Sequence, residues 1–122
     1  MKNLYTPSAP AAIGPYSQAV EVQNTVYTSG QIGIDPETGN LRDGLEAQVV
    51  QIMKNQSAIL ENAGLGFENV VKTTCFLADM NDFADFNEIY SQYFTSKPAR
   101  SCVEVARLPK NALAEIEVIA VK

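Results

Sequence analysis

Hydrophobic and polar positions alternate along several short segments of the chain, which is typical of β-strands. In the clearest of them, Val26, Thr28 and Gly30 share one face, whereas Tyr27 and Ser29 share the other. The sequence Asp-Pro-Glu-Thr-Gly at residues 35–39 then predicts a turn. Altogether the pattern predicts five strands, at residues 17–22, 26–34, 69–78, 100–107 and 115–121.

A first helix is predicted where apolar residues change to a spacing of three and four. It begins after Asp43, which forms the pattern of a capping box with Glu46. Gly64 and Gly66 are expected to end it. Gln56 interrupts the apolar stripe, which otherwise consists of Leu45, Val49, Ile52, Met53, Ile59, Leu60 and Ala63.

A second helix is predicted with Asn81 or Asp82 as its cap, and Pro98 prevents its continuation. Its apolar stripe consists of Phe83, Phe86, Tyr90, Tyr93 and Phe94.

The resulting order, β-β-α-β-α-β-β, predicts an α+β fold in a single domain over residues 1–122. Two helices can cover only one face of such a sheet. Because the strands carry apolar or small residues on both faces, we expect the uncovered face to meet a second copy in a closed homo-oligomer. The first fifteen residues contain three prolines and are expected to form an irregular arm.

Composition narrows the possible chemistry. With 9 basic and 14 acidic residues, the net charge of −5 argues against sequence-independent binding of nucleic acid. The absence of histidine excludes a Ser-His-Asp triad and any histidine-ligated metal, and two cysteines alone cannot hold zinc. No apolar run is long enough to span a membrane, and the N-terminus lacks a signal-peptide pattern, so we expect a cytoplasmic protein with reduced thiols.

Arg100, at the start of a predicted strand, is the strongest candidate for binding an anion. Its planar guanidinium suits a carboxylate or a phosphate and stays charged at any working pH. Judged by residue type alone, a structural ion pair explains this arginine better. Cys102 follows on the same face, but no histidine is present to activate it, so a buried inert thiol is the better interpretation.

A carboxylate is the main candidate for a general base in this chain. Glu115 and Glu117 alternate with apolar residues at the start of the last strand, where a solvated strand end is the competing interpretation. Tyr16 follows a rigid Gly-Pro corner, although packing explains such a tyrosine equally well. Ser29 and Gly30 are small residues in mid-strand, where a ligand or another backbone can approach closely.

Several stretches of the chain together resemble the Rid family of YjgF-type proteins, and specifically its RidA subfamily. The most specific is the Pro-Ala-Arg-Ser block at 98–101 followed by the late Glu115. The resemblance covers nearly the whole chain, although residues 95–97 are short and polar where members often carry an aromatic residue. The matching stretches are AAIGPYSQA (11–19), TSGQI (28–32), VKTTCFL (71–77), DMNDF (79–83), PARSCVEVARLP (98–109) and EIE (115–117).

The resemblance implies a chorismate-mutase-like fold and a homotrimer with clefts between its subunits. It also implies hydrolysis of 2-imino acids, such as 2-iminobutanoate and 2-iminopropanoate, to 2-oxo acids and ammonia without a metal or cofactor. These reactive intermediates leave pyridoxal-phosphate-dependent serine and threonine dehydratases, so the implied role is protective. By resemblance, Arg100 binds the substrate carboxylate, Glu115 orients and deprotonates a water molecule, and Tyr16 hydrogen-bonds in the cleft. The same resemblance implies that Ser29, Gly30, Asn87 and the backbone of Cys102 line the cleft.

The distance between the two central candidates depends on how the last two strands pair. In a simple hairpin centred near Lys110 and Asn111, Arg100 lies opposite Val121 and roughly 20 Å from Glu115. Either the pairing is then bulged or one of the two residues comes from a neighbouring chain.

Other functions remain open from the sequence. A non-catalytic protein that binds small carboxylates, such as 2-oxo acids, would need Arg100 but not Glu115. An endoribonuclease or translation inhibitor, also described in this family, is disfavoured by the acidic charge and the absence of histidine. Nothing in these residues indicates a chaperone.

Overall fold

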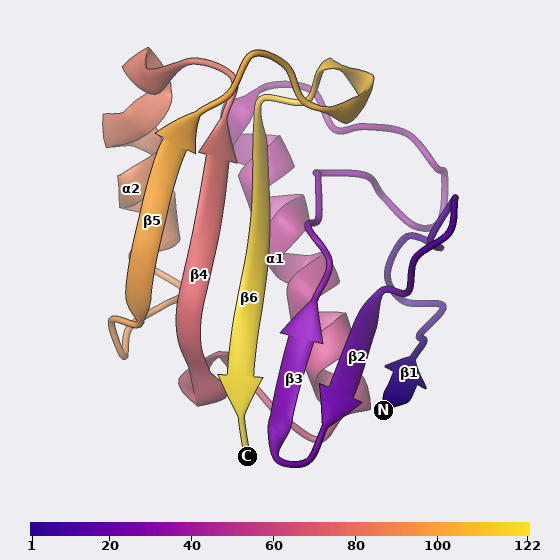
Figure 1. The fold of residues 1–122 in the computed structure, drawn as a ribbon. Helices are drawn as coiled ribbons and strands as arrows, with labels where there is room; N and C mark the ends of the chain where they lie inside the picture. The colour runs from indigo at the N-terminus through magenta and orange to yellow at the C-terminus, as the bar shows by residue number, and fades with distance from the viewer.

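The computed structural model describes residues 1–122 and contains one six-stranded sheet with both helices on the same face (Figure 1). This confirms the predicted α+β class. The strands are β1 (Lys2–Leu4), β2 (Ala19–Val22), β3 (Thr25–Thr28), β4 (Val70–Leu77), β5 (Ala99–Glu104) and β6 (Ala114–Val121), and the helices are α1 (Leu45–Asn62) and α2 (Phe83–Tyr90). Short 3-10 turns precede β4, α2 and β6, at Phe67–Asn69, Met80–Asp82 and Pro109–Asn111.

The strand order is β1-β2-β3-β6-β4-β5, so the last two strands do not pair with each other and the simple hairpin considered above does not form. Helix α2 connects β4 to β5, and such a crossover makes the two strands parallel neighbours. The chain then passes over the end of β4, where Val105 N–H donates to Leu77 O and Ala78 N–H donates to Leu113 O. Strand β6 therefore returns antiparallel on the other side of β4.

The hydrophobic core lies between the sheet and the two helices. Cys75 and Leu77 of β4 and Ile116 of β6 are fully buried on this side. On the opposite face, Tyr27 and Val103 remain exposed, together with the aliphatic ends of β2 and β6. The sheet therefore has one covered and one uncovered face, as the prediction of only two helices implied. Neither helix is long and apolar enough to cross a membrane.

The strand predicted at residues 26–34 ends at Thr28. Beyond Thr28, its pairing with β6 resumes at a single bridge between Gln31 and Ile116, which is displaced by one residue from the Tyr27–Ile119 pairing. An extra residue on the β3 side reverses the alternation, as in a β-bulge. Gly30 consequently faces Glu115, rather than sharing the core face with Val26.

The prediction that Asp43 caps the N-terminus of α1 is wrong. Gly44 occupies the N-cap with φ 88°, and no side chain caps the helix, so Asp43 lies one residue too early to do so. The C-terminal prediction is confirmed, because Gly64 follows the last turn with φ 76°. Helix α2 is shorter than its apolar stripe indicates, because turns continue from Tyr90 to the buried Phe94.

Candidate functional site

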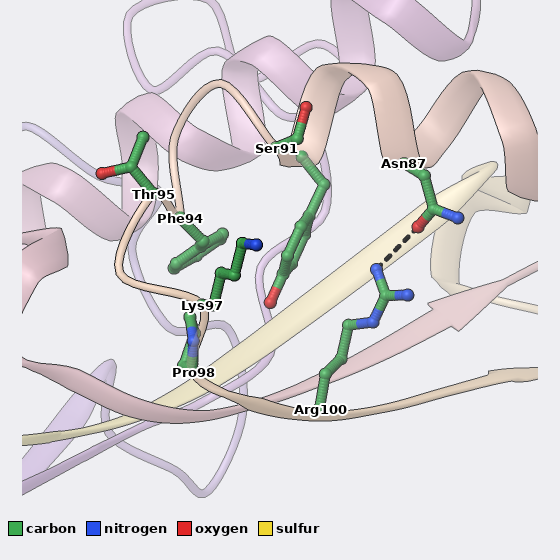
Figure 2. A pocket seen from close by; sticks show the side chains of 8 residues that line it. Asn87, Ser91, Phe94, Thr95, Lys97, Pro98 and Arg100 are labelled. Carbon is green, nitrogen blue, oxygen red and sulfur yellow. Dashed lines mark hydrogen bonds between the residues drawn. The ribbon is translucent and has the colours of Figure 1, made fainter.

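Arg100 projects from β5 toward α2, on the helix-covered face of the sheet. Its Nη1 atom donates a 2.7 Å hydrogen bond to Asn87 Oδ1 (Figure 2). The guanidinium carbon lies 4.8 Å from the centroid of the Tyr90 ring and 5.5 Å from that of Phe83. A cation over an aromatic face is favourable, so Arg100 is oriented by one hydrogen bond and two rings.

The aromatic support beneath Arg100 is itself fixed. Tyr90 shares a 2.7 Å hydrogen bond between its hydroxyl and Thr73 Oγ1, and its ring packs 4.6 Å from that of Phe94. Burial raises the pKa of the Tyr90 phenol, so the ring stays neutral and acts as a packing surface. The cavity beside it, called here the Arg100 cavity, has a volume of about 460 Å³ and is lined by Asn87, Tyr90, Ser91, Phe94, Thr95, Lys97, Pro98 and Arg100.

No carboxylate neutralises Arg100. The two ion pairs of the structure, Arg42 with Asp35 and Lys122 with Glu21, lie elsewhere. The partner of Arg100 is a neutral amide, and no acidic residue lines the cavity. A half-buried guanidinium in these surroundings keeps its remaining donors available for an anion.

A second cavity, of about 510 Å³, contains Glu115 and is called here the Glu115 cavity. Glu115 packs against Gly30 so closely that a Cβ at residue 30 would lie 2.8 Å from the carboxyl carbon. Burial, and secondarily the negative charge of Glu117, raises the pKa of the Glu115 carboxyl. The lining residues are Pro10, Ala11, Ile13, Tyr16, Gln18, Gly30, Gln31, Ile32, Ile34, Pro36, Gly39, Pro109, Lys110 and Glu115.

Buried amide side chains hold the irregular walls of the Glu115 cavity. Gln18 accepts a hydrogen bond from Thr6 N–H and donates to the carbonyls of residues 6, 9 and 10, which fastens the N-terminal arm. Asn55 of α1 donates to the carbonyls of Ile32 and Ile34. Gln56 donates to those of Ser29 and Ile116. These bonds replace the sheet ladder that the bulged segment lacks.

The structure separates the predicted site residues into two groups. Tyr16 and Gly30 line the cavity that contains Glu115, whereas Asn87 lines the cavity that contains Arg100. Ser29 and Cys102 line neither cavity.

Ser29 and Cys102 have structural contacts instead. The Ser29 hydroxyl donates a 2.6 Å hydrogen bond to Ser17 O and so fastens the arm to the bulge. Cys102 pairs with Cys75 across the parallel strands, and burial raises the pKa of both thiols, to about 12 for Cys75. Thiols with raised pKa values are poor nucleophiles at neutral pH.

Arg100 and Glu115 of one chain lie on opposite faces of the sheet. Arg100 pairs with Thr73, whose side chain contacts α2, whereas Glu115 pairs with Phe76 on the uncovered face. Their backbones lie on either side of β4, about 14 Å apart at standard strand spacings. A small molecule held by one of these side chains therefore cannot reach the other within the same chain.

Sequence reasoning missed Lys97 and Tyr90 beside Arg100, as well as the amide contacts around the bulge. One signal for the amides was present, because Gln56 interrupts an otherwise apolar stripe. A buried polar residue in such a stripe indicates a backbone segment that cannot satisfy its own hydrogen bonds.

The fold and the two cavities define an α+β protein with an unpaired arginine and a desolvated carboxylate. The family model described as "Endoribonuclease L-PSP" matches residues 6–122, and the chain belongs to this family. Its relatives include the mouse protein named 2-iminobutanoate/2-iminopropanoate deaminase, which is 54% identical over 99% of this chain and 91% of its own length. Others of similar identity are named only RutC family proteins.

Solved structures agree with this assignment. RidA from an Antarctic Psychrobacter is 48% identical, with a TM-score of 0.97 over the full length of both chains. TdcF of E. coli, solved with bound serine, is 45% identical, with a TM-score of 0.96 over 100% of this chain and 99% of its own. The predicted membership of the Rid family is thereby confirmed.

Proposed function

We propose that this protein hydrolyses 2-imino acids to 2-oxo acids and ammonia, in a site formed by Arg100 of one copy and Glu115 of another. The names of the mouse, human and Salmonella relatives, 52–55% identical, support the reaction. TdcF with bound serine supports a substrate of amino-acid size. Imines released by pyridoxal-phosphate-dependent serine and threonine dehydratases are the expected source, and their removal would be protective.

The observation that carries the two-copy site is the placement of Arg100 and Glu115 on opposite faces of one sheet. Arg100 lies on β5, at one edge of the sheet, whereas the arm and the bulge around Glu115 lie toward the β1–β3 end (Figure 1). A head-to-tail ring brings opposite ends of neighbouring subunits together, and a closed trimer is the smallest such ring. It would also cover the apolar residues left exposed on the open face.

In this site, the chemistry needs one cation, one proton acceptor and a positioned water molecule. Arg100 binds the substrate carboxylate, while Asn87 and the Tyr90 ring hold the guanidinium in place. The pKa of the Glu115 carboxyl is raised toward neutral pH, which makes its carboxylate a stronger base and a more effective proton acceptor. Tyr16 lines the same cavity and supplies a phenol hydroxyl.

The reaction balances without a cofactor. Glu115 takes a proton from water as the oxygen attacks the protonated imine carbon, and the C=N π electrons move to nitrogen. Glu115 then gives this proton to the amine nitrogen. The C–N bond breaks and ammonia leaves as Glu115 removes the hydroxyl proton, so the carbinol oxygen becomes the carbonyl of the 2-oxo acid. That proton passes from Glu115 to the ammonia, which departs as ammonium and leaves Glu115 ionised.

Mixing two inactive variants tests the shared site. We expect Arg100→Gln and Glu115→Gln each to lower kcat/KM for 2-iminobutanoate by about 10³-fold. Subunits exchanged between them at equal amounts would regain about a quarter of the wild-type rate, because one site in four receives both intact residues. No recovery despite demonstrated exchange would reject the two-copy site, and inactive wild-type protein would reject the reaction.

Glu115→Gln also separates the enzyme from a simple carboxylate-binding protein. An enzyme loses turnover with this change, whereas its affinity for 2-oxobutanoate remains within a few-fold. A binding protein would show no imine hydrolysis before or after the change. Salt-dependent RNA binding or cleavage by the wild type would instead favour the endoribonuclease described for the family model.

A further inference from the structure

The Arg100 cavity holds a second cation that the proposed reaction does not use. Lys97 lines this cavity, and Figure 2 shows its side chain among the others that line it. The simplest substrates, 2-iminobutanoate and 2-iminopropanoate, carry one carboxylate, which Arg100 can bind alone. A cavity of about 460 Å³ also leaves room for a longer side chain than either substrate has.

The backbone places Lys97 in a defined way. Its N–H donates a 3.2 Å hydrogen bond to Phe94 O, which closes the turn after α2. Its φ of 56° lies in the left-handed region, where glycine or asparagine would be accommodated more easily than lysine. Pro98 follows directly and fixes the next φ angle, so the turn enters β5 two residues before Arg100.

The charge of Lys97 is not compensated. Neither ion pair of the structure involves it, and the other side chains lining the cavity are neutral apart from Arg100. Ser91 and Thr95 add hydroxyl groups to the same lining. In a chain with a net charge of −5, this cavity therefore combines two cations with hydrogen-bond donors and no acid.

We propose that Lys97 is a specificity-determining residue that favours 2-imino dicarboxylates of four or five carbons. This inference rests on the proposed imine hydrolysis and extends it to a substrate class. Arg100 binds the carboxylate next to the imine carbon, and Lys97 binds the carboxylate at the far end of the side chain. The bonds made and broken at the imine are unchanged. Such substrates form when a flavin-dependent oxidase removes hydride from an acidic amino acid.

The test compares two imines and their two products. 2-Iminosuccinate and 2-iminobutanoate are generated in situ by amino-acid oxidases, and kcat/KM is measured for wild type and Lys97→Met. We expect Lys97→Met to lower kcat/KM for 2-iminosuccinate about fivefold, because Lys97 is exposed and one charge pair with an exposed lysine contributes at most about 1 kcal/mol. The value for 2-iminobutanoate should stay within about twofold. Affinities for oxaloacetate and 2-oxobutanoate, measured by calorimetry, should change in the same ratio.

Two control variants isolate the effect of the charge at residue 97. Lys97→Arg keeps the charge and should retain the preference for the dicarboxylate. Lys54→Met removes an equal charge from an exposed position on α1 and should leave both substrates unaffected. A preference that also disappears in Lys54→Met would indicate only the overall charge and would overturn the role of Lys97.

The outcomes separate this inference from the proposed reaction. If 2-iminobutanoate is hydrolysed and Lys97→Met changes both substrates equally, the role of Lys97 is wrong and the reaction stands. If neither imine is hydrolysed, the reaction is wrong, and the ratio of oxaloacetate to 2-oxobutanoate affinity still tests Lys97. An unchanged ratio in Lys97→Met would reject the second carboxylate site.

Discussion

The two cavities are built in different ways. Arg100 lies between regular elements, because β5 carries it and α2 supplies Asn87 and the aromatic support. Glu115 also lies on a regular strand, but the walls of its cavity are an irregular arm, a bulge and a 3-10 turn. Buried amides fix these walls in place of a ladder. Secondary-structure packing thus positions both charged residues, but the surroundings of Glu115, unlike those of Arg100, depend on side-chain hydrogen bonds between distant segments.

Of the changes considered, Asn55→Leu should have the largest effect on the support of the Glu115 cavity, without affecting the Arg100 cavity. The change keeps the branched shape and the number of side-chain heavy atoms but removes the hydrogen bonds to Ile32 O and Ile34 O and the one accepted from Gln51 Nε2. We expect a loss of about 3 kcal/mol in the free energy of unfolding, measured by urea denaturation, because buried partners are left unpaired. Hydrogen exchange should quicken at Asp35 and Arg42, whose amides bond within the loop, and not in β5.

Ser57→Ala on the same helix is the control. Its only side-chain hydrogen bond is an exposed 3.4 Å contact with Glu61, so stability should change by less than about 0.5 kcal/mol. If Asn55→Leu loosened the Arg100 cavity as much as the bulge, the two cavities would not be supported independently.

Gly30→Ala should act on the Glu115 cavity alone. The added methyl group would meet the Glu115 carboxyl group at 2.8 Å, and that side chain can move aside. We expect imine hydrolysis to fall about 10²-fold, because a displacement near 1 Å is enough to misplace a catalytic group. The melting temperature and Arg100-dependent binding of 2-oxobutanoate should change little.

Gly64→Ala is the converse variant, because it should change stability without changing activity. Nothing lies within 4 Å of its Cβ position, but its φ of 76° disfavours alanine. Stability should therefore fall by about 1 kcal/mol, with normal turnover.

If Gly30→Ala instead kept full activity, Glu115 would have no part in the proposed mechanism.

The smallest expected effect is the pH dependence of stability at Glu115. The raised pKa means that the folded protein binds this proton more tightly than the unfolded chain does. The contribution of Glu115 is therefore most favourable below the unfolded pKa of 4.5 and is lost as pH rises through the raised folded value.

Glu115→Gln should consequently raise the melting temperature at pH 7 relative to wild type, and the gain should disappear near pH 3. Thermal unfolding at several pH values measures this. The exposed Glu37→Gln, which changes the net charge equally, should show no such pH-dependent gain. A variant that is more stable at pH 3 than at pH 7, relative to wild type, would contradict the desolvation of Glu115.

The local pattern of residues was enough to predict the secondary structure, the main candidate residues and the family of this protein. The spacing of apolar residues predicted both helices and five of the strands, because periodicity of 3.6 or 2 follows directly from burial of one face. It missed β1, whose three residues are too few to show a period. The residue types alone drew attention to Arg100 and Glu115, and the Pro-Ala-Arg-Ser block with its late glutamate indicated the family.

Only the tertiary structure decided how these parts meet. Placing β4 between β5 and β6, rather than pairing the last two strands, puts Arg100 and Glu115 on opposite faces. A single extra residue after Thr28 turns Gly30 toward Glu115, and Gln56, an irregularity in the helical pattern, bonds to the bulge from 27 residues away. Such pairings depend on contacts between distant segments, whose free energies no local pattern of residues contains.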